Sequence, residues 1–314
     1  MTMNERDMRT AYIETLQKLG AENPNLVVLD SDLAASTGSK QFADVYPDRF
    51  FDCGIQEANM IGVAAGMSAM GMVPIVHSFA AFAGRRVVDQ VFMSCAYAGL
   101  NVRIVGVDPG LCAGKNGGTH MSLEDMGIMR TIPGVTVLDP SDEISLAKLL
   151  RQSVETPGVY YLRLNRKATV RLYESDADIR IGKANRLCPG SDVTLIAAGT
   201  LCVPEAVRAS DALKARGISA RVLDMATIKP LDVQAVQCAA RETRAIITIE
   251  NHNVIGALGS AVSEVLAESG TVPFARIGVQ DVFGQVGSIA ELQAFYGITA
   301  QAIEQKALAL LNRN

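Results

Sequence analysis

Four short segments of the sequence place acids, aromatic rings, glycines or a histidine directly after an expected strand. The carboxyl ends of strands in an open parallel sheet are where ligands usually bind. Side chains gathered there are therefore the first candidates for chemistry. The segments are Asp30 to Thr37, Asp52 to Met60, His77 to Arg86, and Gly114 to Asp125.

Each segment has a chemical interpretation and a plainer one. Glu57 begins an apolar, Gly/Ala-rich helix, where it can serve catalysis or only complement the helix dipole. Phe79 and Phe82 lie three residues apart, which suits ordinary core packing or a flat surface for a ring. His120 ends a Gly-rich loop and is a candidate proton donor or acceptor. Asp32 can cap a helix or face a ligand.

Several classes of function are disfavoured by what the sequence lacks. It contains no GxGxxG, no GxxxxGK[ST] and no GxSxG motif. The three histidines, His77, His120 and His252, are not spaced as metal ligands, and Ser31 has no obvious histidine partner. Formal net charge is -4 with no basic run, so we expect no nucleic-acid partner.

We expect a cytoplasmic protein with no membrane contact. No apolar stretch reaches the roughly 18 residues that a span needs. The polar start of the chain, Met1 to Arg9, does not resemble a secretory signal. The six cysteines show no CxxC spacing, which favours free thiols over disulfides or zinc.

Short apolar runs alternate with helical patterns, which predicts an α/β fold with mostly parallel sheets covered on both faces. We expect two three-layer domains, residues 1–180 and residues 181–314, with a charged, irregular linker at Lys167 to Gly190. In the first half the expected strands are 26–29, 73–76, 102–107, 135–138 and 159–164, and the helices 9–19, 60–70, 87–98 and 144–154. In the second half the strands are 193–198, 220–223, 245–249 and 274–277, and the helices 202–216, 233–241, 257–267 and the tail.

Taken together, the segments resemble transketolase from its pyrimidine-binding domain to its C-terminus. Asp-Cys-Gly-Ile-Gln-Glu at 52–57 looks like the family's cofactor-glutamate motif, and Asn-Gly-Gly-Thr-His at 116–120 looks like its Asp-Gly-Pro-Thr-His loop. The segments 131–143, 250–260 and 281–284 also match. The order and spacing of these motifs identify the family, and imply its pyrimidine-binding and C-terminal domains.

The resemblance implies roles for individual residues. Glu57 would hydrogen-bond a ring nitrogen of the aminopyrimidine of thiamine diphosphate, and His120 would contact substrate oxygens and assist proton transfer. Phe79 and Phe82 fall where the family packs aromatic rings on the pyrimidine. The remaining matches are Asp32 and Ile55 near the cofactor, Asn116 on a substrate hydroxyl, and Arg9, Ser36 and Arg166 on the sugar phosphate.

The family binds the diphosphate through a metal held by a Gly-Asp-Gly motif, which this sequence lacks. The resemblance therefore implies a heteromeric transketolase, with two copies of this C-terminal subunit and two of an N-terminal partner. The partner would hold Mg²⁺, Ca²⁺ or Mn²⁺. The pair would transfer a two-carbon ketol unit between a ketose phosphate and an aldose.

Three positions depart from the family pattern. Asn116 replaces a common Asp, Asp108 stands where a phosphate-contacting His is common, and Arg85 replaces an aromatic residue. An Asp at position 108 would repel a phosphate unless an Arg or Lys115 offsets its charge. We therefore expect a modified sugar, such as a branched or otherwise unusual ketose phosphate.

Other interpretations stay open. The closest enzymatic one is the β subunit of a thiamine-diphosphate-dependent 2-oxoacid dehydrogenase, which shares the domains and the glutamate. A second is 1-deoxy-xylulose-5-phosphate synthase, which 86–91 resembles in part. The non-enzymatic alternative is a regulatory or scaffold subunit that has kept the fold and lost the chemistry.

Overall fold

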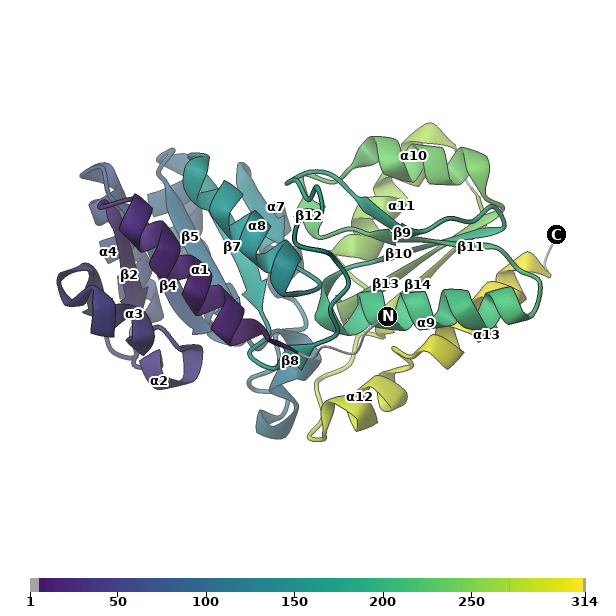
Figure 1. Cartoon of the computed structure of the whole chain (residues 1–314), viewed down its shortest axis with the longest axis horizontal. Coiled ribbons are helices and arrows are strands. Elements are labelled where there is room, and N and C mark those ends of the chain that lie inside the picture. The colour runs from purple at the N-terminus through teal and green to yellow at the C-terminus, as the bar shows by residue number, and fades with distance from the viewer. Residues whose placement is uncertain (1–5, 271, 313–314) are drawn as a thin grey trace.

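A computed structural model describes residues 6–270 and 272–312, arranged as two α/β units side by side (Figure 1). Residues 1–5 lie outside the described residues. They form part of the chain start that we expect not to be a secretory signal. No helix in the described part of the chain is long and apolar enough to cross a membrane.

The first unit is built on a seven-stranded sheet in the order β12-β6-β7-β5-β4-β2-β3. All neighbouring strands are parallel except β12 and β6. A two-stranded antiparallel pair, β1 and β8, ties the ends of this unit together. The elements from the start of the described chain to the end of this unit are β1 (Arg6–Asp7), α1 (Met8–Glu22), β2 (Leu26–Asp30), α2 (Ala34–Thr37), α3 (Lys40–Val45), η1 (Pro47–Arg49), β3 (Phe50–Asp52), α4 (Glu57–Ala69), β4 (Val73–Phe79), α5 (Ala80–Arg85), α6 (Val88–Gln90), η2 (Val91–Tyr97), β5 (Val102–Val107), η3 (Gly110–Asn116), α7 (Asp125–Thr131), β6 (Val135–Leu138), α8 (Glu143–Glu155), β7 (Val159–Leu164) and β8 (Ala168–Thr169).

The second unit has a five-stranded sheet in the order β14-β13-β10-β11-β9, parallel except for β9 against β11. Its elements, together with β12, are β9 (Asn185–Cys188), β10 (Val193–Ala197), α9 (Gly199–Ala215), β11 (Ala220–Asp224), β12 (Thr227–Lys229), α10 (Val233–Glu242), β13 (Ala245–Asn253), α11 (Leu258–Ser269), β14 (Phe274–Val279), α12 (Ile289–Tyr296) and α13 (Ala300–Leu311). The α/β class with mostly parallel sheets is confirmed.

Alternation along the strands distributes the core between the two faces of each sheet. In β2, Leu26 and Val28 pack with α1 and α8, whereas Val27 and Leu29 pack with α4 on the opposite face. This is the period-two pattern of a strand covered on both sides. Each sheet is therefore the middle of three layers, and the carboxyl ends of its strands are free to carry a site.

The structure differs from the sequence expectation in several elements. Residues 87–98, expected as one α-helix, form a short α6 followed by the π-helical η2. The expected linker at Lys167 to Gly190 contains two strands, β8 and β9, and the expected helical tail begins only at α12. Strand β12 comes from the second half of the sequence but pairs with β6 of the first sheet.

Candidate functional site

Glu57 is the first residue of α4 and is buried, with 4% of its surface exposed. The short strand β3 brings the chain up to this helix at the edge of the sheet. The Ser78 hydroxyl, near the end of β4, lies 3.4 Å from Oε1 of Glu57 and donates to it. The side chain also lies at the positive N-terminal end of α4, where a negative charge is stabilised.

Arg86 is the charged partner of Glu57. One of its terminal nitrogens lies 3.0 Å from Oε1 and 3.1 Å from Oε2 of the carboxylate. Its guanidinium carbon also lies 3.8 Å from the centre of the Phe82 ring, a cation–π contact. Phe82 lies in α5 and Arg86 caps the C-terminal end of this helix four residues later, which places both side chains on one face. The sequence pattern gave Arg86 no role of its own, although this spacing could have indicated one.

Three rings form the centre of the site. Phe79 ends β4 and Phe82 lies one turn into α5, and both are half-buried. The ring of His120 lies 5.2 Å from that of Phe82 and 6.2 Å from that of Phe79, edge to face in both cases. Phe79 and Phe82 are 6.3 Å apart. An aromatic floor beside a carboxylate and an imidazole suits a flat heteroaromatic ligand with polar edges.

Glycines fix the path of the loop that carries His120. A Cβ at Gly114 would lie 2.5 Å from the carbonyl oxygen of Gly287, and a Cβ at Gly118 would lie 2.6 Å from that of Gly284. Any larger residue at either position would push the loop off the segment between β14 and α12. The Thr119 hydroxyl lies 2.9 Å from Nδ1 of His120 and helps to orient its ring. Backbone contact between the two halves of the chain therefore positions the histidine.

A buried ion-pair cluster around Arg163 holds the segment that follows this loop. Arg163, 1% exposed, donates to both carboxylate oxygens of Asp125, to the Ser122 carbonyl and to Asp139. Burial acts to raise the pKa of the Asp125 carboxyl, but the charge and hydrogen bonds of Arg163 outweigh burial and lower it. Arg163 also donates to the carbonyl of Asn251 in the second unit. Sequence reasoning missed this cluster, because its members are far apart in the chain.

The opposite end of the site holds two more guanidinium groups. Arg9 and Arg166 each donate to the carbonyl oxygen of Ser36, both at 3.3 Å. The guanidinium of Arg166 also lies 5.3 Å from the centre of the Phe79 ring. Three residues expected at a sugar phosphate thus meet at one place, next to the aromatic floor. Asp108 joins them by pairing with Arg166.

The remaining expected site residues lie at the surface. Asp32 is exposed in the left-handed region, and its amide donates to Asp52 at 3.0 Å. Ile55 is 68% exposed on the loop before α4, and Asn116 is exposed at the end of η3. The structure does not bring these three against the rings, so their roles stay predictions. Arg85, another departure from the family pattern, pairs with Glu124 and donates to the Thr119 carbonyl.

Two further features bear on ligands. Residues 6–270 and 272–312 contain no group of three or more histidines, cysteines or acids placed to hold a metal ion. A cavity of about 360 Å³ lies beside the site, lined by Arg85, Gly118, Met121 and residues 281–284 among others. It extends the site toward the second unit.

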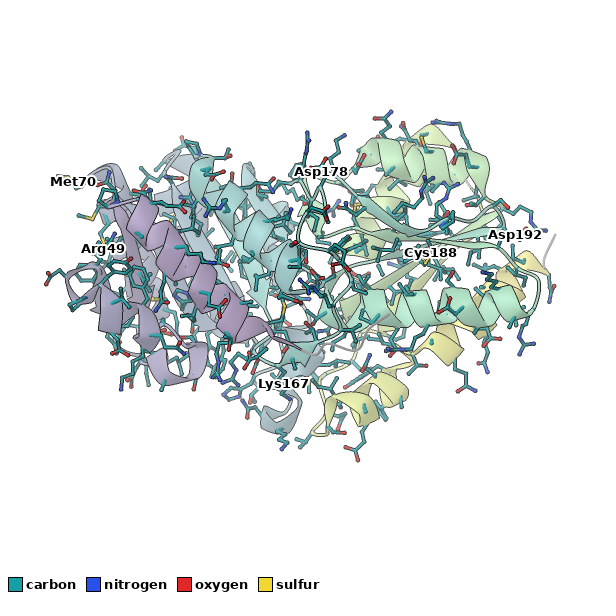
Figure 2. All side chains as sticks on the ribbon, viewed as in Figure 1. Arg49, Met70, Lys167, Asp178, Cys188 and Asp192 are labelled. Atoms are coloured by element: carbon teal, nitrogen blue, oxygen red, sulfur yellow. The ribbon has the colours of Figure 1, made fainter. Side chains whose placement is uncertain are left out.

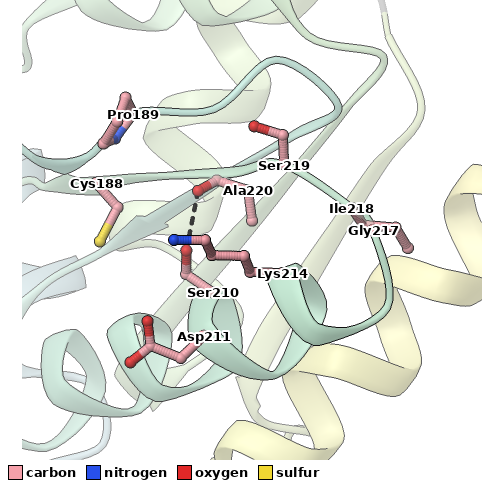
Figure 3. A pocket seen from close by; sticks show the side chains of 9 residues that line it. All are labelled: Cys188, Pro189, Ser210, Asp211, Lys214, Gly217, Ile218, Ser219 and Ala220. Atoms are coloured by element: carbon pink, nitrogen blue, oxygen red, sulfur yellow. Dashed lines mark hydrogen bonds between the residues drawn. The ribbon is translucent and has the colours of Figure 1, made fainter.

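A separate cavity of about 500 Å³ lies on the second unit, between α9 and the ends of β9 and β11 (Figure 3). There Ser210 donates to the carbonyl of Ala220 at 3.0 Å, and Asp211 and Lys214 of α9 also line the cavity. It shares no lining residue with the site of Glu57 and His120.

Both halves of the chain match models of known families. Residues 4–170 match the transketolase pyrimidine-binding domain, and residues 182–303 match the transketolase C-terminal domain. The domain boundary near residue 180 stays a prediction.

Three relatives match over nearly their whole length. A 6-deoxy-6-sulfo-D-fructose transketolase subunit of Clostridium sp. is 46% identical, over 99% of this chain and 96% of the relative. An apulose-4-phosphate transketolase subunit of Phocaeicola vulgatus is 38% identical over the full length of both proteins. A solved structure described as a split gene transketolase, inactive beta4 tetramer, is 38% identical with a TM-score of 0.90, covering 98% of this chain and 99% of that one.

Proposed function

The chain belongs to the transketolase family, and we propose that it is the C-terminal subunit of a heteromeric, thiamine-diphosphate-dependent enzyme that transfers a two-carbon ketol unit. The observation that carries this proposal is the cluster of Phe79, Phe82 and His120, which the buried Glu57 joins through Arg86. A degenerate scaffold subunit has no need to keep a buried carboxylate next to this aromatic floor.

The residues present fit the aminopyrimidine ring of the cofactor. Phe79 and Phe82 offer an apolar face, and Arg86 already presents an N–H donor to Glu57 at the distance a protonated ring nitrogen would use. When the ring binds, Arg86 would give up its hydrogen bond to Glu57, which would then bond the ring nitrogen. Arg86 would keep its contact with the Phe82 ring. Asp32 and Ile55 would border the ring from the exposed loops. When bound, thiamine diphosphate supplies the carbon–carbon bond chemistry, which the protein positions.

The chain's own residues would orient the sugar and move protons. His120, half-buried between the rings and the solvent, would hold substrate oxygens and transfer a proton at them. Asn116, on the same loop, would hydrogen-bond a substrate hydroxyl. Arg9 and Arg166, with Ser36, would hold the far end of the sugar, because a guanidinium offers several aligned donors.

We place the diphosphate and its metal, Mg²⁺, Ca²⁺ or Mn²⁺, on an N-terminal partner chain. Exposed apolar side chains at both ends of α4 and on η2, which packs against α4, support an interface there, because exposed apolar surface can mark an interaction site. Met70, at the C-terminal end of α4 and labelled at the outer end of the first unit in Figure 2, is 82% exposed. The others are Phe51, Ile55, Met72, Phe92, Met93 and Tyr97. Two copies of each chain, in the cytoplasm, complete the proposal.

The substrate we propose is a modified ketose. Two relatives that match over nearly their whole length act, by name, on 6-deoxy-6-sulfo-D-fructose and on apulose 4-phosphate, neither of which is an ordinary pentose phosphate. Asp108 and Asn116, which depart from the family pattern at the positions for the phosphate and for a substrate hydroxyl, are consistent with a modified sugar.

An assay of the assembled pair tests this function. The chain is mixed with its candidate partner, cofactor and magnesium, and ketol transfer is followed with modified ketoses and with xylulose 5-phosphate plus ribose 5-phosphate. We expect transfer only in the mixture, and faster with a modified ketose. Ordinary transketolase rates with the two pentose phosphates would refute the modified substrate. Decarboxylation of pyruvate instead would favour the 2-oxoacid dehydrogenase subunit.

A further inference from the structure

Asp108 is held in an unusual conformation at the end of β5. Its φ is +52°, which few residues other than glycine adopt, and its side chain is 4% exposed. Oδ2 accepts from Nε of Arg166 at 2.8 Å and from a terminal nitrogen at 2.5 Å, while Oδ1 accepts from the Arg166 amide at 3.3 Å. Backbone strain of this kind persists where the surroundings enforce it, and is frequent at functional sites.

The pairing leaves the subsite with little net positive charge. Two guanidinium groups, Arg9 and Arg166, point at the Ser36 carbonyl. Arg9 also faces the carboxylate of Asp7 at 3.9 Å, and Arg166 faces Asp108. Two positive and two negative groups give a formal sum of zero. An incoming anionic group must therefore compete with Asp108 for the Arg166 donors.

Charge on the ligand decides how costly that competition is. By Coulomb's law, a group with two negative charges is repelled by Asp108 about twice as strongly as a group with one, but it is also attracted about twice as strongly by the two guanidinium groups, so these effects offset each other in a subsite of zero formal charge. The cost of removing an anion from water grows faster than its charge, and a neutral subsite does not compensate that cost for a second charge. A sulfonate has three acceptor oxygens and a single charge, so it can use the free donors of Arg9 and Arg166 at a lower desolvation cost. A phosphate monoester carries close to two charges at neutral pH.

We propose that Asp108, through its ion pair with Arg166, selects a ketose whose far end carries a single negative charge, as a sulfonate does, over one that ends in a phosphate. The inference rests on the proposed ketol transfer and names the substrate class of that same site. The subsite adjoins the aromatic floor through Phe79, so its charge acts on a substrate already seated at the reacting end.

The test compares two ketoses of similar size, 6-deoxy-6-sulfo-D-fructose and D-fructose 6-phosphate, in the assembled pair with one acceptor. We expect the wild type to have the higher kcat/KM with the sulfonate. Asp108→Asn keeps an oxygen that accepts from Arg166 and tolerates the left-handed backbone, but removes the charge. It should shift the kcat/KM ratio toward the phosphate by about tenfold.

Asp178→Asn is the matched control. It removes one charge from an exposed pair with Arg180, at the upper edge of the domain junction in Figure 2, whereas Lys167, next to Arg166, lies at the lower edge. It should leave the ratio unchanged. A wild type that prefers the phosphate, or an Asp108→Asn ratio equal to that of the wild type, would overturn the inference.

Titration of the same two ketoses into the pair without cofactor separates this inference from the proposed function. Failure to turn over either ketose would count against ketol transfer. Tighter binding of the sulfonate, lost in Asp108→Asn, would still support the charge selection. Equal or absent binding of both would contradict it.

Discussion

At the scale of single residues, Glu57 is the group on which the proposed chemistry depends. It is buried, and its charge is balanced by Arg86, which is itself 48% exposed. Glu57→Gln keeps the shape of the side chain and an oxygen that accepts from Arg86, but it cannot share a proton with a ring nitrogen. We expect kcat of the assembled pair to fall at least about 100-fold, the usual contribution of a positioned proton-transfer group.

Glu22→Gln controls for the loss of one charge, because Glu22 forms an exposed pair with Arg151 and such pairs contribute little. Activity should be unchanged in this variant. Circular dichroism of both variants checks that the fold is kept. Full activity of a folded Glu57→Gln pair would favour the scaffold interpretation.

At the scale of elements, Asp224 joins the end of β11 to the first unit. Its Oδ2 accepts from the Ser141 hydroxyl at 2.5 Å and the Tyr173 hydroxyl at 2.8 Å. Burial raises the pKa of this carboxyl to about 7, against the lowering effect of the two hydrogen bonds. A carboxyl whose folded pKa exceeds its unfolded value binds protons more tightly when folded, so its contribution to stability is lost as pH rises from about 4 to 7.

Asp224→Asn has no carboxyl to ionise at this position, so it avoids the cost of a buried charge at high pH, and it keeps an accepting oxygen. We expect the variant to gain stability relative to the wild type at pH 7.5, by about 2–4 kcal/mol, and to gain much less at pH 5. Urea unfolding at both pH values measures this. Burial also raises the pKa of Glu250 to about 7, but Glu250 is present in both proteins, so its effect on stability cancels in the comparison. The same stability difference at both pH values would contradict the assigned pKa.

The sequence predicted most strands and helices because their apolar patterns are strong and local. It did not predict β9 and β12, because these short strands are held by partners far away in the chain, β11 and β6. The π-helical η2 was also missed, since π-helical turns are rare and a seven-residue stretch is too short for apolar spacing to separate them from α-helix. Pattern alone does not show which sheet a three-residue strand such as β12 will join.

Part of the site could be predicted for similar reasons. Glu57, Phe79, Phe82 and His120 stand in motifs; in the structure the three rings contact one another, and Glu57 reaches them through Arg86. Arg86 was not assigned a role, because its partner is 29 residues away. Nor did the sequence show that Asp108 and Arg166 pair across 58 residues, a contact that depends on β5 and β7 being neighbours.

At the scale of the whole molecule, the site lies where both units meet an open surface. The loop of His120 rests on the segment between β14 and α12, and Phe283 of that segment is 91% exposed. The described residues offer Glu57 and an aromatic floor for one ring of the cofactor. We therefore propose that the active site belongs to an assembly, with the diphosphate and metal on another chain.

Isothermal titration of thiamine diphosphate and magnesium, into this chain alone and then into its mixture with the candidate N-terminal chain, tests that account most directly. We predict tight binding in the mixture and only weak binding to this chain by itself. Tight binding to this chain alone would contradict the shared site, because the diphosphate and metal would then be held here.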